Sequence, residues 1–185
     1  MRPPDHTDIL TLPGELTKNR KALEHAVAAV MPTTWPEGEK RLVATQAELI
    51  GKVLIRRLHS DVRRAKIGYL FQERMQTRAT VTLGKAKKAS VELHYYAELD
   101  FVIEFNHEAW LELPPNAKIA LVDHELAHLG LDDTGQYCLV PHDVEEFGAI
   151  VLRWGLWRPS LVTFGHAVAN QLELFEKLDV AKAAK

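Results

Sequence analysis

The chain has 185 residues, of which 46% are hydrophobic and 26% are charged, and its formal net charge is −2. These values predict one globular domain with a core of its own, and they leave no overall field that attracts nucleic acid or a membrane surface. No apolar run approaches the roughly 20 residues that cross a bilayer. Cys138 is the only cysteine, which excludes an intramolecular disulfide and a cysteine-based zinc finger, so a reduced, cytoplasmic setting is expected.

The first third of the chain is predicted to be mainly helical. Five of the nine prolines lie within residues 1–40, which we interpret as an N-terminal arm that carries one short helix at about residues 16–30. Residues 41–185 are expected to form the main domain. A longer helix is predicted over residues 40–64, because apolar side chains there recur at spacings of three and four.

Three strands are predicted in the middle of the chain. They cover residues 79–83 (ATVTL), 89–96 (ASVELHYY) and 100–105 (DFVIEF), which alternate in polarity or are rich in β-branched and aromatic side chains. Together with the helices on either side, these strands predict an α+β fold with a small, mostly antiparallel sheet.

The last third is predicted to return to helices. After two prolines, Asn116 is expected to cap a helix that ends at Gly130, and residues 131–141 then form a loop. Asp143 and Glu146 have the spacing of a variant capping box that opens a further helix. A final helix is predicted from about residue 159 to residue 181.

The sequence VDHELAH, at residues 122–128, raises the main functional question. Positions four apart on an α-helix lie on one face, so His124 and His128 are able to direct ring nitrogens at one metal ion. Glu125 flanks that point without being a ligand. This is the arrangement of zinc hydrolases, in which the metal lowers the pKa of a water molecule and the glutamate accepts its proton. The alternative is a partly exposed helix face with paired polar residues.

A catalytic zinc ion needs a third protein ligand and an open position. The downstream sequence VPHDVEEFG offers His142, Glu145 and Glu146. We favour His142, because it lies where a loop is predicted to meet a helix. Glu146 has an alternative role as the capping-box residue. Glu145 alternatively faces solvent or orients a ligand histidine. Thr134 stands where the longer metzincin signature has a histidine, so that class is excluded.

With these motifs in hand, the chain resembles the putative phage metallopeptidase family, which is found in phages and prophages. The resemblance rests on DFVIEFNHEAW, ALVDHELAHL and VPHDVEEFG, within residues 65–155. It implies a zincin-like metallopeptidase domain in which His124, His128 and, less directly, His142 bind Zn²⁺ and Glu125 is the catalytic base. The arrangement is also similar to that of SprT-like peptidases, which place a third histidine shortly after the motif.

The resemblance implies hydrolysis of a peptide bond in a protein or peptide substrate. In zincins the substrate lies extended along an edge strand beside the active-site helix, and residues 100–105 are the candidate strand here. An ordinary internal strand is the equal alternative for that segment. Tyr137 lies between the two metal-binding motifs, where it is either a hydrogen-bond donor to a developing oxyanion or a packing residue.

A second hypothesis belongs to another functional class. It is a non-catalytic, phage-derived binding module in which zinc only joins two helices and Glu145 or Glu146 completes a four-coordinate site. DNA or a nuclease is its candidate partner. Separately, the stretches at residues 55–66 and 84–90 together hold eight Lys and Arg residues, which form either a phosphate-binding patch, useful to a peptidase that acts on DNA-bound proteins, or an ordinary solvated helix face and loop. Histidine and carboxylate ligands also suit iron, manganese and cobalt. Substrate, cleavage specificity and oligomeric state are left open by the sequence.

Overall fold

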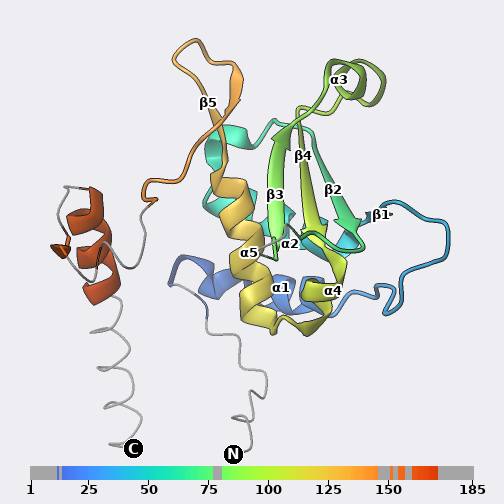
Figure 1. Ribbon diagram of the computed structural model, residues 1–185, viewed down its shortest axis with the longest axis horizontal. Coiled ribbons are helices and arrows are strands. Elements are labelled where there is room, and N and C mark those ends of the chain that lie inside the picture. The colour runs from blue at the N-terminus through green and yellow to red at the C-terminus, as the bar shows by residue number, and fades with distance from the viewer. Residues whose placement is uncertain are drawn as a thin grey trace, which may run out of the picture. The chain divides into compact units, whose positions relative to one another are not determined.

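A computed structural model describes residues 12, 14–76, 81–145, 151, 154–156 and 160–170 (Figure 1). The chain divides into two compact units, residues 1–140 and residues 141–185, and each is described by itself. The elements of the first unit, in chain order, are the 3₁₀ helix η1 (Gly14–Asn19), α1 (Arg20–Val27), β1 (Leu42–Val43), α2 (Thr45–Arg57), the 3₁₀ helix η2 (Ser60–Val62), β2 (Ile67–Gln72), β3 (Gly84–Lys88), α3 (Val91–Ala97), β4 (Phe101–Asn106), α4 (His107–Glu112), α5 (Pro115–Ala127), β5 (Leu129–Leu131) and β6 (Tyr137–Leu139).

Four of these strands form one sheet in the order β1-β2-β4-β3. The pairs β1–β2 and β3–β4 are antiparallel, and the pair β2–β4 is parallel. β5 and β6 form a separate antiparallel hairpin. The predicted α+β fold, with a small and mostly antiparallel sheet beside the helix that carries the HELAH motif, is therefore confirmed. β3 is an edge strand of the sheet, and it lies next to α5 (Figure 1).

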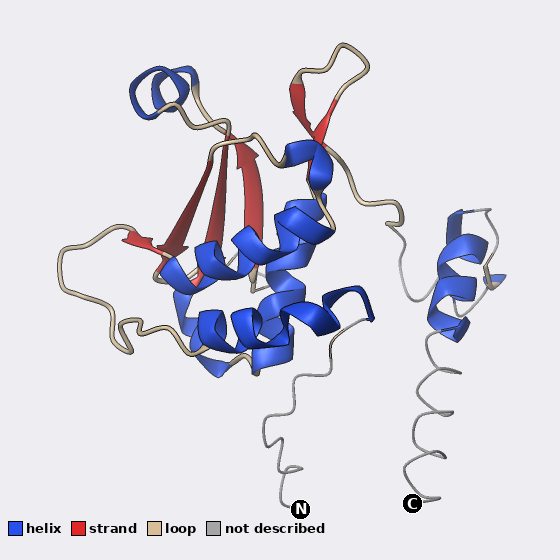
Figure 2. Cartoon of the chain, turned by 180° about the vertical axis from the view of Figure 1, so that it is seen from behind, coloured by secondary structure: helices blue, strands red, loops and turns tan. Residues whose placement is uncertain are grey.

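The core lies between one face of the sheet and the helices α1, α2 and α5. Tyr69 pairs in register with Ile103, and Phe71 with Phe105, so strand alternation places all four side chains on the same face. Each of them is at least 94% buried, since none is more than 6% exposed. α1 and α2 pack against each other on the helical side of this layer (Figure 2). Other core side chains include Leu16 of η1, Leu23 of α1, Ile50 and Leu54 of α2, and Val122 and Leu126 of α5.

The long helix predicted over residues 40–64 is shorter in the structure. α2 begins at Thr45, because Leu42 and Val43 pair with β2 as the short edge strand β1. It ends at Arg57, and residues 60–62 form the separate turn η2. The helix predicted at residues 16–30 is present as η1 followed by α1.

The strand predicted at residues 89–96 is wrong, because residues 91–97 form the helix α3. Ser90 caps this helix by accepting a hydrogen bond from the Leu93 backbone N–H at 3.3 Å. The helix ends where Glu98 adopts a left-handed φ of 56°. β-propensity reflects packing on a half-buried pleated surface, and no residue of α3 is buried. Local capping therefore determines the structure of this segment.

The other two predicted strands have different outcomes. Of residues 79–83, Ala79 and Thr80 lie outside the described residues, and Val81 forms only an isolated bridge with Gln76. The strand predicted at residues 100–105 is present as β4, whose six residues are all buried. β4 lies between β2 and β3, so it is an internal strand.

α5 begins and ends earlier than predicted. Its N-cap is Pro114 and its first residue is Pro115, whose fixed φ and missing N–H suit the first helical position, so the predicted Asn116 cap is wrong. The helix ends at Ala127 with His128 as its C-cap. Residues 131–141 are not a simple loop, because the backbone that follows α5 is taken up by the β5–β6 hairpin.

Part of the second unit, residues 141–185, is described. Residues 160–170 are helical, which agrees with the final predicted helix over that part of it. Asp143 is not helical, and its predicted capping partner Glu146 lies outside the described residues. None of the helices among the described residues is both long and apolar enough to span a membrane.

A buried glutamine of α2 links this helix to α4 and to the segment that follows α1. Gln46 of α2 is 5% exposed. Its Nε2 donates to the carbonyl oxygens of Val27 at 2.9 Å and Ala29 at 2.5 Å, just after α1. Its Oε1 accepts from Trp110 Nε1 of α4 at 2.9 Å. One side chain thus satisfies a buried indole N–H and two backbone carbonyls.

We expect Gln46→Met to lower the free energy of unfolding by about 2–3 kcal/mol, because it removes three hydrogen bonds and leaves the buried Trp110 N–H unsatisfied. Urea denaturation measures this change. The matched control is Gln72→Met in β2, where the half-buried glutamine side chain makes no hydrogen bond to the described residues, and a change within about 0.5 kcal/mol is expected. Equal losses in the two variants would contradict the role of Gln46.

Candidate metal centre

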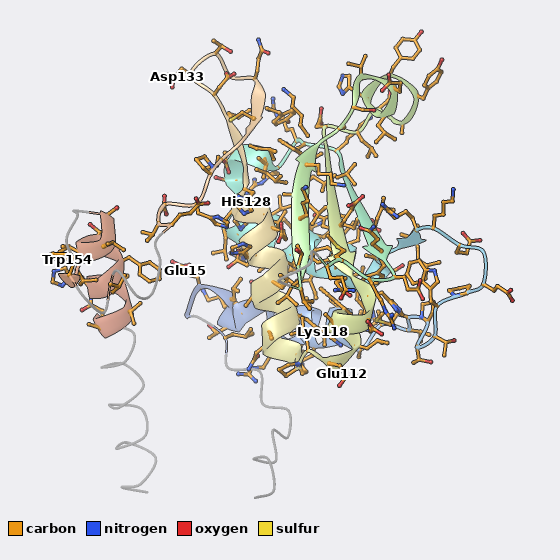
Figure 3. All side chains as sticks on the ribbon, viewed as in Figure 1. Glu15, Glu112, Lys118, His128, Asp133 and Trp154 are labelled. Atoms are coloured by element: carbon orange, nitrogen blue, oxygen red, sulfur yellow. The ribbon has the colours of Figure 1, made fainter. Side chains whose placement is uncertain are left out.

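α5 places three of the predicted site residues at its C-terminal end. The rings of His124 and His128 meet edge to face, with centroids 5.1 Å apart and planes inclined at 86°. Glu125 is turned toward β3 instead, where its carboxylate lies against Gly84, and it is only 3% exposed. His128 lies where α5 gives way to the hairpin (Figure 3). One turn of helix therefore presents two imidazoles outward and one carboxylate inward.

The hairpin fixes the orientation of the His128 ring. The Val140 backbone N–H donates to the His128 carbonyl oxygen at 2.7 Å, and His128 Nδ1 lies 2.8 Å from the Val140 carbonyl oxygen. A carbonyl oxygen only accepts hydrogen bonds, so Nδ1 carries the proton and Nε2 keeps its lone pair. Metal-binding histidines are oriented by this kind of hydrogen bond, and it leaves Nε2 as the available ligand atom.

His142 follows Val140 by two residues, at the start of the second unit. His124, His128 and His142 each offer one ligand atom, and these three atoms lie within 4.8 Å of one another. His142 Nδ1 lies 3.4 Å from Glu145 Oε1. A carboxylate on Nδ1 again leaves Nε2 as the ligand atom. Glu145 is therefore engaged with a histidine ring, and Glu146 lies outside the described residues.

The backbone of β3 lies directly against the Glu125 side chain at Gly84. A Cβ atom placed on Gly84 would lie 2.5 Å from Glu125 Oε1 and 2.8 Å from its Cδ. Non-bonded carbon and oxygen atoms do not approach this closely, so a side chain at this position would force Glu125 or the strand to shift. Gly84 was not among the predicted site residues. The signal that was available is the lysine-rich segment GKAKK, since lysines are frequent on edge strands.

A further contact, which no local sequence pattern predicts, joins α5 to the start of η2 at the residue before the motif. His59 Nε2 lies 2.7 Å from Asp123 Oδ1, which joins the start of η2 to the residue before His124. The two residues are 64 positions apart, so no local pattern indicates the pair.

The structure decides between the alternatives that the sequence left open for two features near the site. The candidate edge strand at residues 100–105 is wrong, because β4 is internal and the edge beside α5 belongs to β3. Tyr137 packs its ring edge to face on Phe101, with centroids 5.4 Å apart, and it joins the rim of the core. This is the packing role that was the alternative to an oxyanion donor.

The two basic stretches are interrupted by acidic partners. Lys66 pairs with Glu98, and Lys87 pairs with Glu104 at 2.5 Å. The pKa of the exposed Glu98 carboxyl is lowered, mainly by its hydrogen bond to Lys66. These ion pairs reduce the positive charge that the stretches present together, and nucleic-acid binding stays a prediction.

A scan against protein families matches residues 40–171 to the family described as Putative phage metallopeptidase. The chain belongs to this family. The match covers all three histidines and Glu125, and it extends beyond the residues 65–155 that carried the resemblance. A search of the curated proteins and a search of the solved structures find no match. The similarity to SprT-like peptidases therefore stays a prediction.

A phage metallopeptidase requires a metal ion, and the chemistry of the donor set fits one. Three imidazoles supply neutral nitrogen ligands within 4.8 Å of one another. Two of these rings have an acceptor oxygen at Nδ1, which leaves the opposite nitrogen free of a proton. Three nitrogen ligands also leave room for a water molecule or substrate in a tetrahedral site.

Proposed function

We propose that this chain is a zinc-dependent peptidase in which His124, His128 and His142 bind the metal and Glu125 is the general base. The observation that carries the proposal is the convergence of three histidine ligand atoms within 4.8 Å, together with the buried Glu125 that directly follows the first of these histidines. The family match supports peptide-bond hydrolysis as the reaction class.

The bound metal would supply a Lewis acid that polarises the substrate carbonyl and lowers the pKa of water. The chain's own residues supply the rest of the chemistry. Val140 holds the His128 ring with Nε2 directed away from the hairpin. Glu125 accepts the proton of the attacking water and then delivers it to the leaving amine, so its carboxylate must be held close to both. Gly84 provides the space in which that carboxylate lies.

The edge of β3 provides a surface for an extended substrate. Asn106 N–H donates to Leu83 O, and Ala89 N–H donates to Asp100 O, both at 2.9 Å, so the odd-numbered residues of this segment face β4. Gly84 and Ala86 therefore turn their backbone N–H and C=O groups away from β4. A peptide that adds to this edge as a further strand would run past Glu125.

The setting of the reaction is also part of the proposal. A phage or prophage origin follows from the family, and a cytoplasmic location is supported by the single free cysteine, Cys138. The competing hypothesis is a zinc-stabilised binding module with a fourth protein ligand from Glu145. The position of Glu145 beside His142 Nδ1 supports an orienting role instead.

We expect one zinc ion per wild-type chain and a strong loss of zinc in His142→Ala, because two histidines alone hold the metal weakly. Elemental mass spectrometry after dialysis against metal-free buffer measures zinc, iron, manganese and cobalt together. Glu145→Ala is the matched control, and it is expected to keep most of its zinc since it removes only a partner of the ligand ring. Full zinc in His142→Ala, with loss in Glu145→Ala, would assign the third ligand to Glu145.

A further inference from the structure

The lysines of β3 are not explained by metal binding or by hydrolysis. We propose that they select the substrate: the edge of β3 binds extended peptides that carry acidic side chains at two alternate positions, opposite Lys85 and Lys87. This inference rests on the proposed function, because it names the substrate class of the same site. It is argued from the strand register, the charges on the open sheet face and the geometry of strand addition.

Register separates the two kinds of residue in β3. Lys85 pairs with Glu104 and Lys87 with Val102, whereas Ala86 pairs with Ile103, a core residue that faces the helices. Alternation therefore places Lys85 and Lys87 on the sheet face that points away from the helices. Gly84, Ala86 and Lys88 share the face that points toward the helices, and Gly84 lies against Glu125 of α5. The strand thus presents two small residues and one lysine on that face, and Lys85 and Lys87 on the opposite face.

The charges on that opposite face do not cancel. Glu104 is 7% exposed and pairs with Lys87 at 2.5 Å and with Arg41 at 3.5 Å. Lys85 is exposed, and no carboxylate among the described residues forms an ion pair with it. Glu104 is shared between Lys87 and Arg41, and Lys85 leaves a positive charge on the edge strand β3 that no described carboxylate pairs with. An edge strand with unmatched cations attracts an anionic strand and repels a cationic one.

If a substrate adds to β3 as a further strand, the positions of Lys85 and Lys87 determine which substrate side chains are preferred to be acidic. Residues directly opposite each other on neighbouring strands have Cβ atoms about 4.5–5.5 Å apart on the same face. A substrate residue opposite Lys85 and another opposite Lys87 are two positions apart, and both point away from α5. The residue between them lies opposite Ala86 and points to the sheet face on which Gly84 contacts Glu125. The preferred substrate therefore has two acidic residues separated by one residue of any type.

The test measures binding separately from cleavage. Fluorescein-labelled peptides with a central Glu-Ala-Glu or Gln-Ala-Gln are titrated with zinc-loaded, full-length Glu125→Gln protein, and anisotropy is recorded. We expect the acidic peptide to bind roughly three- to tenfold more tightly at low salt, as two cross-strand charge pairs allow. The ratio should fall toward one in high salt, because the lysines are exposed to solvent.

Lys85→Gln, made in the same Glu125→Gln protein, should reduce the preference, and Lys85→Glu should reverse it. The matched control is Lys52→Gln, a lysine of α2 that lines a cavity with Ile67 and Tyr69 of β2, a strand separated from β3 by β4. The inference is overturned if the two peptides bind equally, if neither binds at millimolar concentration, or if Lys52→Gln has the same effect as Lys85→Gln. Cleavage of the neutral peptide by wild-type protein is scored independently. An acidic preference without any cleavage would instead refute the proposed peptidase function.

Discussion

Glu125→Gln is expected to bind zinc at the wild-type ratio and to lose peptide hydrolysis by a factor of about 10²–10⁴, the usual contribution of a positioned general base. Glutamine has the same shape, so it fills the buried position that Glu125 occupies at 3% exposure. Its amide does not accept a proton from water. The three histidines that offer ligand atoms are unchanged, so metal binding and catalysis should separate.

The measurement combines zinc content with the kcat for a peptide cleaved by the wild type. Glu112→Gln on α4 is the control for the same chemical change, because Glu112 is exposed and lies outside the three-histidine cluster (Figure 3). Its kcat should stay within about twofold of the wild-type value. Unchanged hydrolysis in zinc-loaded Glu125→Gln would refute the base assignment. Loss of zinc from that variant would place Glu125 among the ligands.

Local periodicity explains what the sequence predicts well in this protein. The spacing of four in the HELAH motif is enough to expect the rings of His124 and His128 on one helical face, and their centroids lie 5.1 Å apart. Glu125 directly follows His124, so it lies about 100° around the helix from that residue. These two features need no knowledge of the other elements, whereas the burial of Glu125 against Gly84 depends on β3.

Long-range pairing explains what the sequence leaves open. His142 lies fourteen positions after His128, and the sequence alone favoured it as the third ligand without excluding Glu145 and Glu146. The segment between the histidines is a hairpin, and its β5–β6 pairs return the chain to His128 through Val140. Strand pairing of this kind depends on which partner is present, so a short run such as YCL carries little signal of its own.

The sheet edge shows the same limit more sharply. ASVELHYY has the composition of a strand and forms α3, whereas GKAKK has little strand composition and forms β3. What makes β3 a strand is the register with β4, and what makes α3 a helix is the Ser90 cap. Composition therefore made residues 100–105 the candidate edge strand, with an internal strand as the equal alternative. The edge beside α5 is the neighbouring strand, β3.

Gly84→Ala is expected to lower kcat by about 100-fold while zinc binding is retained. The new methyl group would lie 2.5 Å from Glu125 Oε1 and 2.9 Å from its Cγ, so the carboxylate or the strand has to move. Glu125 is almost fully buried, which leaves its side chain little space in which to move away. A displacement of about 1 Å in a catalytic group is enough for a loss of this size. Alanine keeps the backbone N–H and C=O, so KM should change little.

Two further variants separate a positioning role for Gly84 from general damage to the fold. Gly14→Ala is the control for the same substitution, because no atom lies within 4 Å of the added methyl group, and it should leave kcat unchanged. Glu125→Asp shortens the carboxylate side chain by one methylene and withdraws it from the clash. Adding Gly84→Ala to Glu125→Asp should therefore cost much less than the same change in the wild type. If the cost is equal in both backgrounds, Gly84 does not act through Glu125, and the close approach of β3 to α5 matters only for packing.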